Sequence, residues 1–286
     1  MHHRRRLWKA LRTSGTSRTN VQATTSRSRP HAGTFYDRRV ALYDEIGRGY
    51  AAVRVEDPRL ARAIWDALGD ARTVVNIGAG AGSYEPRDRE VTAVEPSVVM
   101  IAQRPDGAAA AVVASAEKLP FADDSFDAAM AVITLHHWND VDAGLREMGR
   151  VARRRVVVVT FDQELEASLW IGRDYIRERV VRTFSSLPPI SRILETFPEA
   201  AVRPLPLPND CTDRMFAALW ARPEEYLDPQ VRAATSVWQR LPAEVETRAI
   251  DELRRDLASG EWDRRYGHLR TTPEYDVGLR VVAAEL

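Results

Sequence analysis

The chain has 286 residues and a hydrophobic fraction of 44%, and its 41 basic residues balance 41 acidic ones. This length suits one elaborated α/β domain, and the neutral total argues against broad electrostatic binding to nucleic acid or to a membrane. No apolar run reaches the roughly 18 to 20 residues that a membrane-spanning helix needs, and the single Cys211 excludes an internal disulfide, so a cytoplasmic protein is expected.

The first 33 residues form a basic arm. No acidic residue precedes Asp37, although arginine recurs along this stretch. Such a composition resembles an organellar transit peptide or an arm that binds nucleic acid. Because no apolar periodicity runs through residues 13–33, we expect a disordered, solvated extension over residues 1–33.

Apolar runs alternate with helical segments between residues 34 and 162. The first helix is predicted over residues 57–70, with Asp57 as its cap and Pro58 at its first position. Another helix is predicted over residues 139–152. The Val-rich and Ile-rich runs predict buried strands, which we place at 73–77, 91–95, 110–113, 126–135 and 155–161. Buried strands that alternate with helices predict a doubly wound parallel sheet, which binds ligands at the carboxyl ends of its strands.

The pattern changes after Phe161. Residues 163–198 and 209–272 are expected to be mainly helical, with residues 200–208 as one more strand and residues 274–284 as the final strand. We therefore divide the chain into the arm (1–33), a core (34–162) and a part that adds substrate-side helices and the last strands (163–286).

A glycine loop follows the first predicted strand. Gly78, Gly80 and Gly82 have the spacing G-x-G-x-G, whereas the dinucleotide fingerprint has G-x-G-x-x-G. Glycine lets the backbone turn sharply and approach a ligand closely. Glu95 ends the second predicted strand, from which a carboxylate can accept both hydroxyls of a ribose. The pair indicates an adenosine-type cofactor, and the glycine spacing makes a dinucleotide oxidoreductase the weakest of the alternatives.

These motifs resemble the class I S-adenosylmethionine-dependent methyltransferases, in particular the small-molecule branch with the ubiquinone/menaquinone-type methyltransferase domain. The resemblance rests on NIGAGAG (76–82), AVEPS (93–97), the segment 115–140 and the segment 145–161. It covers roughly residues 40–162. It implies a Rossmann-like, doubly wound, mostly parallel seven-stranded α/β sheet with a C-terminal helical lid, and S-adenosylmethionine as the cofactor.

The resemblance also implies which residues bind the cofactor. The glycines would hold its methionine part, Glu95 its ribose, and Met100 its adenine face, although Met100 could equally fill the core. In addition, Arg54 could pair with the cofactor carboxylate and Tyr43 or Tyr50 could close over the cofactor, although a place on a helix surface is the alternative for these three. The full set of expected cofactor-binding residues is Asn76, Gly78, Gly80, Gly82, Glu95, Pro96, Met100, Ser115, Ala116, Glu117, Arg54 and Tyr43. The family usually has an acid where Asn76 stands and often an Asp where Ser115 stands, so another acid or a carbonyl has to compensate at Asn76.

The chemistry of methyl transfer requires an acceptor held in line and protected from water. A base is needed only if the acceptor loses a proton. His136, His137 and Asp162 follow predicted strands and are the candidates, with one histidine expected to face the site. The alternative is a structural HHW turn in which Trp138 packs against the next helix. These residues do not have the spacing of a metal site.

The carboxyl-terminal half is expected to recognise the acceptor. It carries many aromatic residues, namely Trp170, Tyr175, Phe184, Phe216, Trp220, Tyr226, Trp238, Trp262 and Tyr266. A lid lined by some of them suits a hydrophobic or aromatic small molecule, with Asp210 and His268 as polar candidates and Cys211 as a packed thiol. The sequence thus predicts methylation of O, N or C in a small metabolite, in bacterial secondary metabolism. A tRNA or protein methyltransferase and a non-methylating cofactor-binding protein or cyclase stay open, as does a homo-oligomer.

Overall fold

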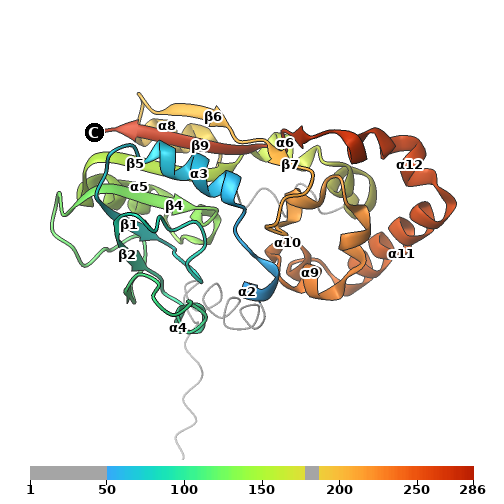
Figure 1. Cartoon of the computed structure of the whole chain (residues 1–286), viewed down its shortest axis with the longest axis horizontal. Coiled ribbons are helices and arrows are strands. Elements are labelled where there is room, and N and C mark those ends of the chain that lie inside the picture. Colours follow the sequence, from blue (N-terminus) through green and yellow to red (C-terminus); the bar gives the residue numbers. More distant parts are fainter. Residues whose placement is uncertain (1–49, 178–186) are drawn as a thin grey trace, which may run out of the picture. The chain divides into compact units, whose positions relative to one another are not determined.

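A computed structural model describes residues 50–177 and 187–286, so the basic arm, Tyr43 and Phe184 lie outside the described residues. Seven strands form one sheet in the order β3-β2-β1-β4-β5-β9-β6, and Figure 1 shows β4, β5 and β9 side by side. The pairs up to β5 are parallel, and β9 runs antiparallel to both β5 and β6. The prediction of a doubly wound, mostly parallel seven-stranded sheet is therefore confirmed. The strands are β1 (Thr73–Ile77), β2 (Glu90–Val94), β3 (Ala111–Val112), β4 (Phe126–Val132), β5 (Ala152–Phe161), β6 (Ala201–Pro204) and β9 (Leu279–Glu285).

Both faces of the central strands are covered, which explains why apolar residues occupy successive positions in these strands. Val74 and Val157 belong to one buried cluster, whereas their neighbours Val75 and Val158 belong to a second one. Successive side chains of a strand point to opposite faces, so the two clusters lie on the two sides of the sheet. The sheet is thus the middle layer of a three-layer arrangement.

The helices of the two outer layers begin where the sequence predicts. Helix α3 (Pro58–Ala67) packs against β5 and β9, and the carboxylate of Asp57 caps it by accepting from the backbone N–H of Arg59. Helix α5 (Val141–Val151) contacts β4, β5 and α8 (Ile190–Thr196). The alternation of strand and helix in the sequence therefore predicts both outer helical layers.

Several of the predicted strands are shorter or divided in the structure. The strand predicted over 126–135 ends at Val132, because Ile133 has a φ of 50° and a 3-10 turn follows at Leu135–His137. The segment 200–208 holds β6 and a separate short strand, β7 (Leu207–Pro208). Prolines without N–H groups interrupt it. The last predicted strand is likewise divided into β8 (Glu274–Tyr275), which pairs with β7, and β9.

Short helices dominate the part after β5. They are α6 (Gln163–Ala167), the π-helical η2 (Ile171–Ile176), η4 (Phe216–Leu219), η5 (Pro223–Leu227), α9 (Pro229–Ala233), α10 (Ser236–Gln239), α11 (Ala243–Ser259), α12 (Glu261–Tyr266) and η6 (Gly267–Thr271). Figure 1 shows α9, α10, α11 and α12 grouped together apart from the sheet. We call residues 207–275 the helical lid. Among the described residues, no helix combines the length and apolar character needed to cross a membrane.

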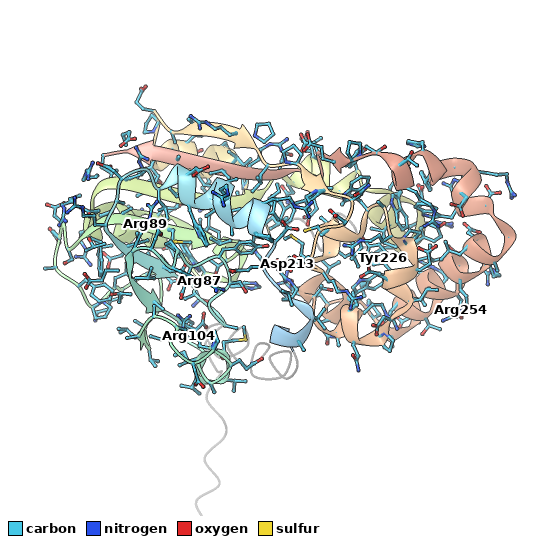
Figure 2. All side chains as sticks on the ribbon, in the orientation of Figure 1. Arg87, Arg89, Arg104, Asp213, Tyr226 and Arg254 are labelled. Atoms are coloured by element: carbon cyan, nitrogen blue, oxygen red, sulfur yellow. The ribbon has the colours of Figure 1, made fainter. Side chains whose placement is uncertain are left out.

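The aromatic residues of this part pack against one another. The ring of Trp170 contacts the rings of Tyr175, Tyr226, Trp262 and Tyr266. Tyr226 is fully buried and lies inside the helical lid in Figure 2. These rings belong to the same cluster as the α3 face of the sheet. The aromatic side chains therefore mainly hold the lid together.

Candidate active site

A cavity opens at the carboxyl ends of the strands, where the doubly wound sheet predicts it. Its walls come from the glycine loop after β1, the turn after β2, the turn after β4, helix α6 and the helical lid. It thus joins the core predicted to bind the cofactor to the part predicted to recognise the acceptor. It brings together most of the predicted site residues, namely Arg54, Asn76, Gly78, Gly80, Glu95, Pro96, Met100, Ser115, Ala116, Glu117, His136 and His137.

The glycine loop needs its first glycine for two reasons. Gly78 has a φ of 72°, and a Cβ at this position would lie 2.1 Å from Oγ1 of Thr134. The backbone N–H groups of Gly78 and Ala79 both donate to the carbonyl of Val94. A side chain would therefore force the loop away from the ends of β1 and β2.

Gly82 does not line the cavity, in contrast to the sequence-based prediction. Its φ is 94° and its N–H donates to the carbonyl of Ala79, so it closes the turn behind the loop. A Cβ at Gly82 would meet the guanidinium of Arg104 at 3.2 Å. The third glycine shapes the loop from outside the cavity.

Asn76 at the end of β1 belongs to a buried network. Its Nδ2 donates to Oε1 of Glu85 at 3.0 Å, and Oε2 of Glu85 accepts from Nη2 of Arg104 at 2.6 Å. Arg104 and Glu85 are 5% and 9% exposed. The carboxylate that the sequence lacks at position 76 thus lies directly behind it. Glu85 follows the glycine loop in SYEP, but the spacing alone gives no sign of this contact.

The Oδ1 atom of Asn76 is buried and has no hydrogen-bond partner within the described residues. Asn76 lines the cavity, and its amide is fixed by the bond from Nδ2 to Glu85. A buried acceptor without a partner is costly. This atom therefore offers a binding position for an N–H or ammonium donor in the cavity.

Glu95 presents a carboxylate on the other side of the glycine loop. It is 7% exposed, Oε2 accepts from the N–H of Gly80 at 2.8 Å, and Oε1 accepts from the N–H of Ser97 at 2.9 Å. Burial raises its pKa, and these two hydrogen bonds oppose the shift. Each oxygen retains a lone pair, which can accept from a hydroxyl of a ligand.

The side predicted to hold an adenine ring is built from two segments. Met100 in α4 (Val98–Ile101) is 3% exposed and lines the cavity. Ser115 and Ala116 line it as well. Oε1 of Glu117 accepts from the backbone N–H of Asn139 at 2.6 Å, which ties this segment to the start of α5. An apolar face and a polar edge therefore lie on the same part of the wall.

Arg54 lines the cavity while it forms a buried ion pair. Its Nε and Nη2 donate to the two carboxylate oxygens of Asp213, at 2.5 and 3.2 Å. The hydroxyl of Tyr84 also donates to Asp213, at 2.8 Å. Figure 2 places Asp213 between the sheet and the helical lid. Arg54 thus connects the wall of the cavity to the lid.

Both adjacent histidines line the cavity, whereas the sequence predicts that one of them faces the site. They do not leave an extended strand but lie in the 3-10 turn after β4, where their ring centroids are 3.7 Å apart. Trp138 is buried against α5, since a Cβ on Gly144 would lie 2.3 Å from its ring. The packing that was predicted for Trp138 is present.

Three predicted polar residues do not reach the cavity. The carboxylate of Asp162 caps α6 by accepting from the N–H groups of Glu164 and Leu165. Asp210 pairs with Arg59 on the surface, and His268 is exposed. The cavity lining includes none of the three.

Glu166 is a cavity residue that the sequence does not distinguish. It lies in α6, is 4% exposed and has no partner for Oε2 among the described residues. Burial raises its pKa to about 8. Glu164 has the same side chain two residues earlier and is exposed, so only the folded structure separates them.

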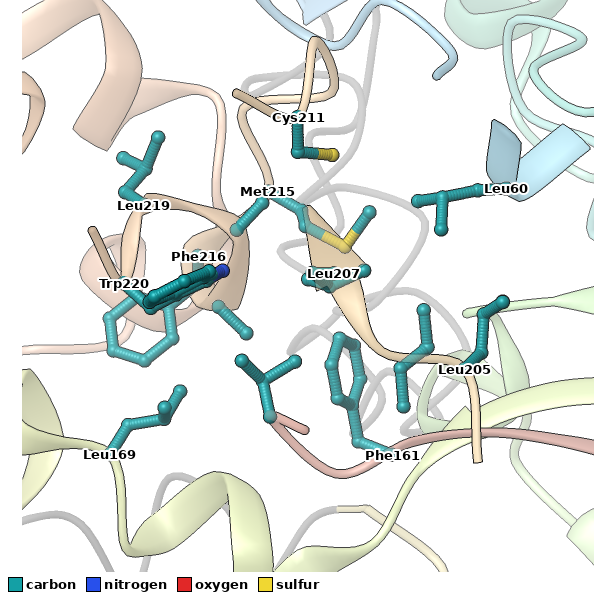
Figure 3. Packing of buried hydrophobic residues seen from close by; sticks show 14 of the residues in the cluster. Leu60, Phe161, Leu169, Leu205, Leu207, Cys211, Met215, Phe216, Leu219 and Trp220 are labelled. Carbon is teal, nitrogen blue, oxygen red and sulfur yellow. The ribbon is translucent and has the colours of Figure 1, made fainter. Parts of the chain in front are cut away.

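Apolar side chains form the wall around the lid end of the cavity. Of the aromatic residues predicted to line the lid, Phe216 does so within the described part of the chain. Figure 3 shows Phe161, Leu207, Met215 and Phe216 in one apolar cluster, with Cys211 beside it. Cys211 is fully buried, and burial raises the pKa of its thiol to about 12, as expected for a packed thiol. The remaining apolar residues of the cavity wall are Val132, Ile133, Leu187, Ala217, Ala234 and Val237.

These features fit the cofactor that the sequence resemblance implies. Oδ1 of Asn76 suits an ammonium group, the open glycine loop admits a ligand backbone, and Glu95 suits a ribose. Within the residues that the structure describes, no cluster of three or more His, Cys, Asp or Glu side chains could hold a metal ion.

Comparisons with known proteins agree with this arrangement. A family model for the methyltransferase domain matches residues 75–160. A demethylmenaquinone methyltransferase from Mycobacterium marinum is 36% identical over 175 residues, which are 57% of this chain and 73% of that relative. The enzyme of the same name from Roseiflexus sp. is 35% identical over 124 residues, 41% of this chain, and the chain spans half of its length.

A crystal structure shows that the likeness extends into the helical lid. It is described as a methyltransferase from an antibiotic biosynthesis pathway of Anabaena variabilis. It is 30% identical, covers 82% of this chain and 99% of its own, and superimposes with a TM-score of 0.74. The family model ends at residue 160, whereas the likeness to this neighbour continues into the part of the chain that forms the other side of the cavity.

Proposed function

Since the chain belongs to the class I S-adenosylmethionine-dependent methyltransferases, we propose that it methylates a hydrophobic small molecule at O, N or C. The observation that carries the proposal is one cavity whose walls combine the glycine loop and Glu95 with the apolar side chains of Phe161 and the lid. The polar part matches the methyl donor. The apolar part suits a hydrophobic acceptor, which moves from water into the cavity when it binds.

The polar wall would hold the cofactor as follows. Oδ1 of Asn76 would accept from its ammonium group, with Glu85 orienting the amide from behind. Glu95 would accept from the ribose hydroxyls, and Met100 would pack on the adenine. When bound, S-adenosylmethionine supplies a methyl group on a positively charged sulfur, which a nucleophile can displace.

The side chains of the protein hold the acceptor in position and keep water away from it. Phe161, Met215 and Phe216 exclude water from the acceptor side of the cavity. The ion pair between Arg54 and Asp213 holds the lid against the segment that precedes α3. His136 and His137 line the cavity and remain candidates for proton transfer. Holding two reactants in line accounts for a large part of such a rate enhancement.

The relatives support a small-molecule substrate. The names of the relatives from M. marinum and Roseiflexus refer to a quinone precursor, and the neighbour from A. variabilis is described as part of an antibiotic pathway. We extend this to a cytoplasmic enzyme of bacterial secondary metabolism. The neutral total charge of the chain favours such an acceptor over tRNA.

The proposal is tested by incubating the full chain with methyl-labelled S-adenosylmethionine and three separate acceptors: a bacterial metabolite extract, bulk tRNA and total protein. We expect label in a hydrophobic small molecule, identified by mass spectrometry, together with S-adenosylhomocysteine. The matched variants are Glu95→Ala, which should reduce the label at limiting S-adenosylmethionine, and Glu90→Ala, which changes an exposed residue of the strand that precedes Glu95. Label that enters only tRNA or protein would overturn the proposal.

A further inference from the structure

Glu166 differs from the other buried acidic side chains of the described residues. Its Oε2 has no hydrogen-bond partner among them. In contrast, every other buried carboxylate there accepts at least two hydrogen bonds. These are Asp57, Glu85, Glu95, Asp127 and Asp213. The fold therefore satisfies its buried acids in general and leaves Glu166 as the exception.

The surroundings of Glu166 give it no structural task. It shares the cavity wall with Phe161, Leu187, Met215 and Phe216, and burial is the cause that raises its pKa to about 8. An apolar side chain of similar size would fill this position at lower cost. A side chain that is kept here in spite of this cost has its partner in the cavity.

Glu166 also differs from the two histidines of the cavity in its local contacts. His136 and His137 have a local reason for their arrangement, since their rings contact each other in the turn that leads into α5. Tyr226 is the titratable group of the lid that interacts electrostatically with Glu166, and its hydroxyl donates to the carbonyl of Phe216. Glu166 is thus the buried carboxylic acid of the apolar wall, and its Oε2 is left for a ligand.

We propose that Glu166 receives the proton that the acceptor loses, and that the acceptor is a hydrophobic molecule with an O–H or N–H group. This inference rests on the proposed function and narrows it from methylation of O, N or C to methylation of O or N. A carboxylate in an apolar pocket binds such a donor strongly, because water does not compete for it.

The proposed step balances as follows. The O–H or N–H bond of the acceptor breaks, its proton moves to a carboxylate oxygen of Glu166, and its electron pair stays on the acceptor atom. That pair forms the new bond to the methyl carbon. The pair of the methyl–sulfur bond leaves with the sulfur, which becomes a neutral thioether.

The test measures binding of four small probes to the full chain saturated with S-adenosylhomocysteine. Phenol and benzylamine carry a donor, whereas toluene and ethylbenzene have nearly the same shapes and carry none. The variants are Glu166→Gln, which keeps the shape, Glu166→Leu, which removes all polarity, and Glu164→Gln as the exposed control on the same helix. Calorimetry with S-adenosylhomocysteine alone shows whether each variant is folded and whether the cofactor side is intact.

We expect phenol or benzylamine to bind the unchanged chain and Glu164→Gln at least about tenfold more tightly than its isostere. This advantage should grow as the pH rises through about 8, because the carboxylate form increases. It should be lost in Glu166→Leu and should no longer depend on pH in Glu166→Gln. Equal binding of donors and isosteres, no binding of either donor, or an advantage that survives in Glu166→Leu would overturn the inference. Failure of the unchanged chain to bind S-adenosylhomocysteine would instead contradict the proposed function.

Discussion

The amide nitrogen of Asn76 donates to the carboxylate of Glu85 at 3.0 Å, so the charge that the family usually carries at position 76 stands one side chain further back. Arg104 neutralises that carboxylate from its other side. An acid at position 76 would place two carboxylates in contact with only one cation to balance them. An asparagine is therefore compatible with Glu85 at this position, and its Oδ1 has no hydrogen-bond partner among the described residues.

This relationship predicts a rescue. Asn76→Asp should lower the free energy of unfolding by about 1 to 3 kcal/mol, because a donor is replaced by a second carboxylate. Adding Glu85→Gln restores one donor and one carboxylate in exchanged positions, and it should recover most of the loss. Urea unfolding of the two single variants and the double variant measures this. If the double variant is no more stable than Asn76→Asp, the two residues do not interact as described.

The loop makes a prediction about two glycines with similar backbones. Gly78 and Gly107 have φ values of 72° and 81°, but a Cβ at Gly107 would meet nothing within 4 Å. Gly107→Ala should cost about 1 to 2 kcal/mol, from the backbone conformation alone. Gly78→Ala should cost at least about 1 to 3 kcal/mol more, because its Cβ collides with Thr134. Equal losses in thermal or urea unfolding would show that the contact with Thr134 is unimportant.

The attachment of the lid is tested by two aspartates. Asp213 is 1% exposed and accepts from Arg54 and Tyr84, whereas Asp210 is 72% exposed and pairs with Arg59. Asp213→Asn should destabilise the chain by about 1 to 3 kcal/mol, since it removes the charged acceptor that Arg54 and Tyr84 share inside the protein. Asp210→Asn should change stability by less than about 1 kcal/mol. A comparable effect of the two substitutions on unfolding would argue against the buried cluster as the anchor.

Glu166 predicts a pH dependence of stability. Its pKa rises from 4.5 to about 8 on folding, so the native state keeps a proton that the unfolded chain releases between these values. Stability should therefore fall as the pH rises through this window. Glu166→Gln cannot ionise and should become more stable than the unchanged chain by a few kcal/mol at about pH 8. Urea unfolding across the pH range measures the difference, and parallel curves would contradict the burial of an isolated carboxyl group.

The fold could be predicted because its signals are local. Runs such as 73–77 and 155–161 are rich in Val and Ile on both faces, as expected of strands covered on both sides, and Asp57 and Pro58 mark a helix start by themselves. The ends of the strands were harder to predict from the sequence. Ile133 ends β4 through its backbone conformation, although its side chain favours a strand.

The cavity shows where sequence reasoning ends. The glycine loop and Glu95 can be recognised from their spacing in the sequence. The importance of Glu85 and Glu166 depends on side chains that are distant from them in the sequence. For the same reason, the sequence does not show which aromatic residues line the cavity and which form the core. Trp170 and Trp262 are of a residue type that is common in binding sites, but they pack against each other. Whether a ring faces a cavity or a core depends on the packing of the whole lid.

The central claim, that this cavity binds S-adenosylmethionine through the glycine loop and Glu95, is tested most directly by calorimetric titration. We expect one molecule of S-adenosylmethionine per chain and no comparable binding of NAD. Glu95→Ala should weaken binding of S-adenosylmethionine by about 1 to 3 kcal/mol, the scale of a lost hydrogen bond to a charged group, while Glu90→Ala should leave it unchanged. Tighter binding of NAD, or an affinity for S-adenosylmethionine that Glu95→Ala does not alter, would contradict the account.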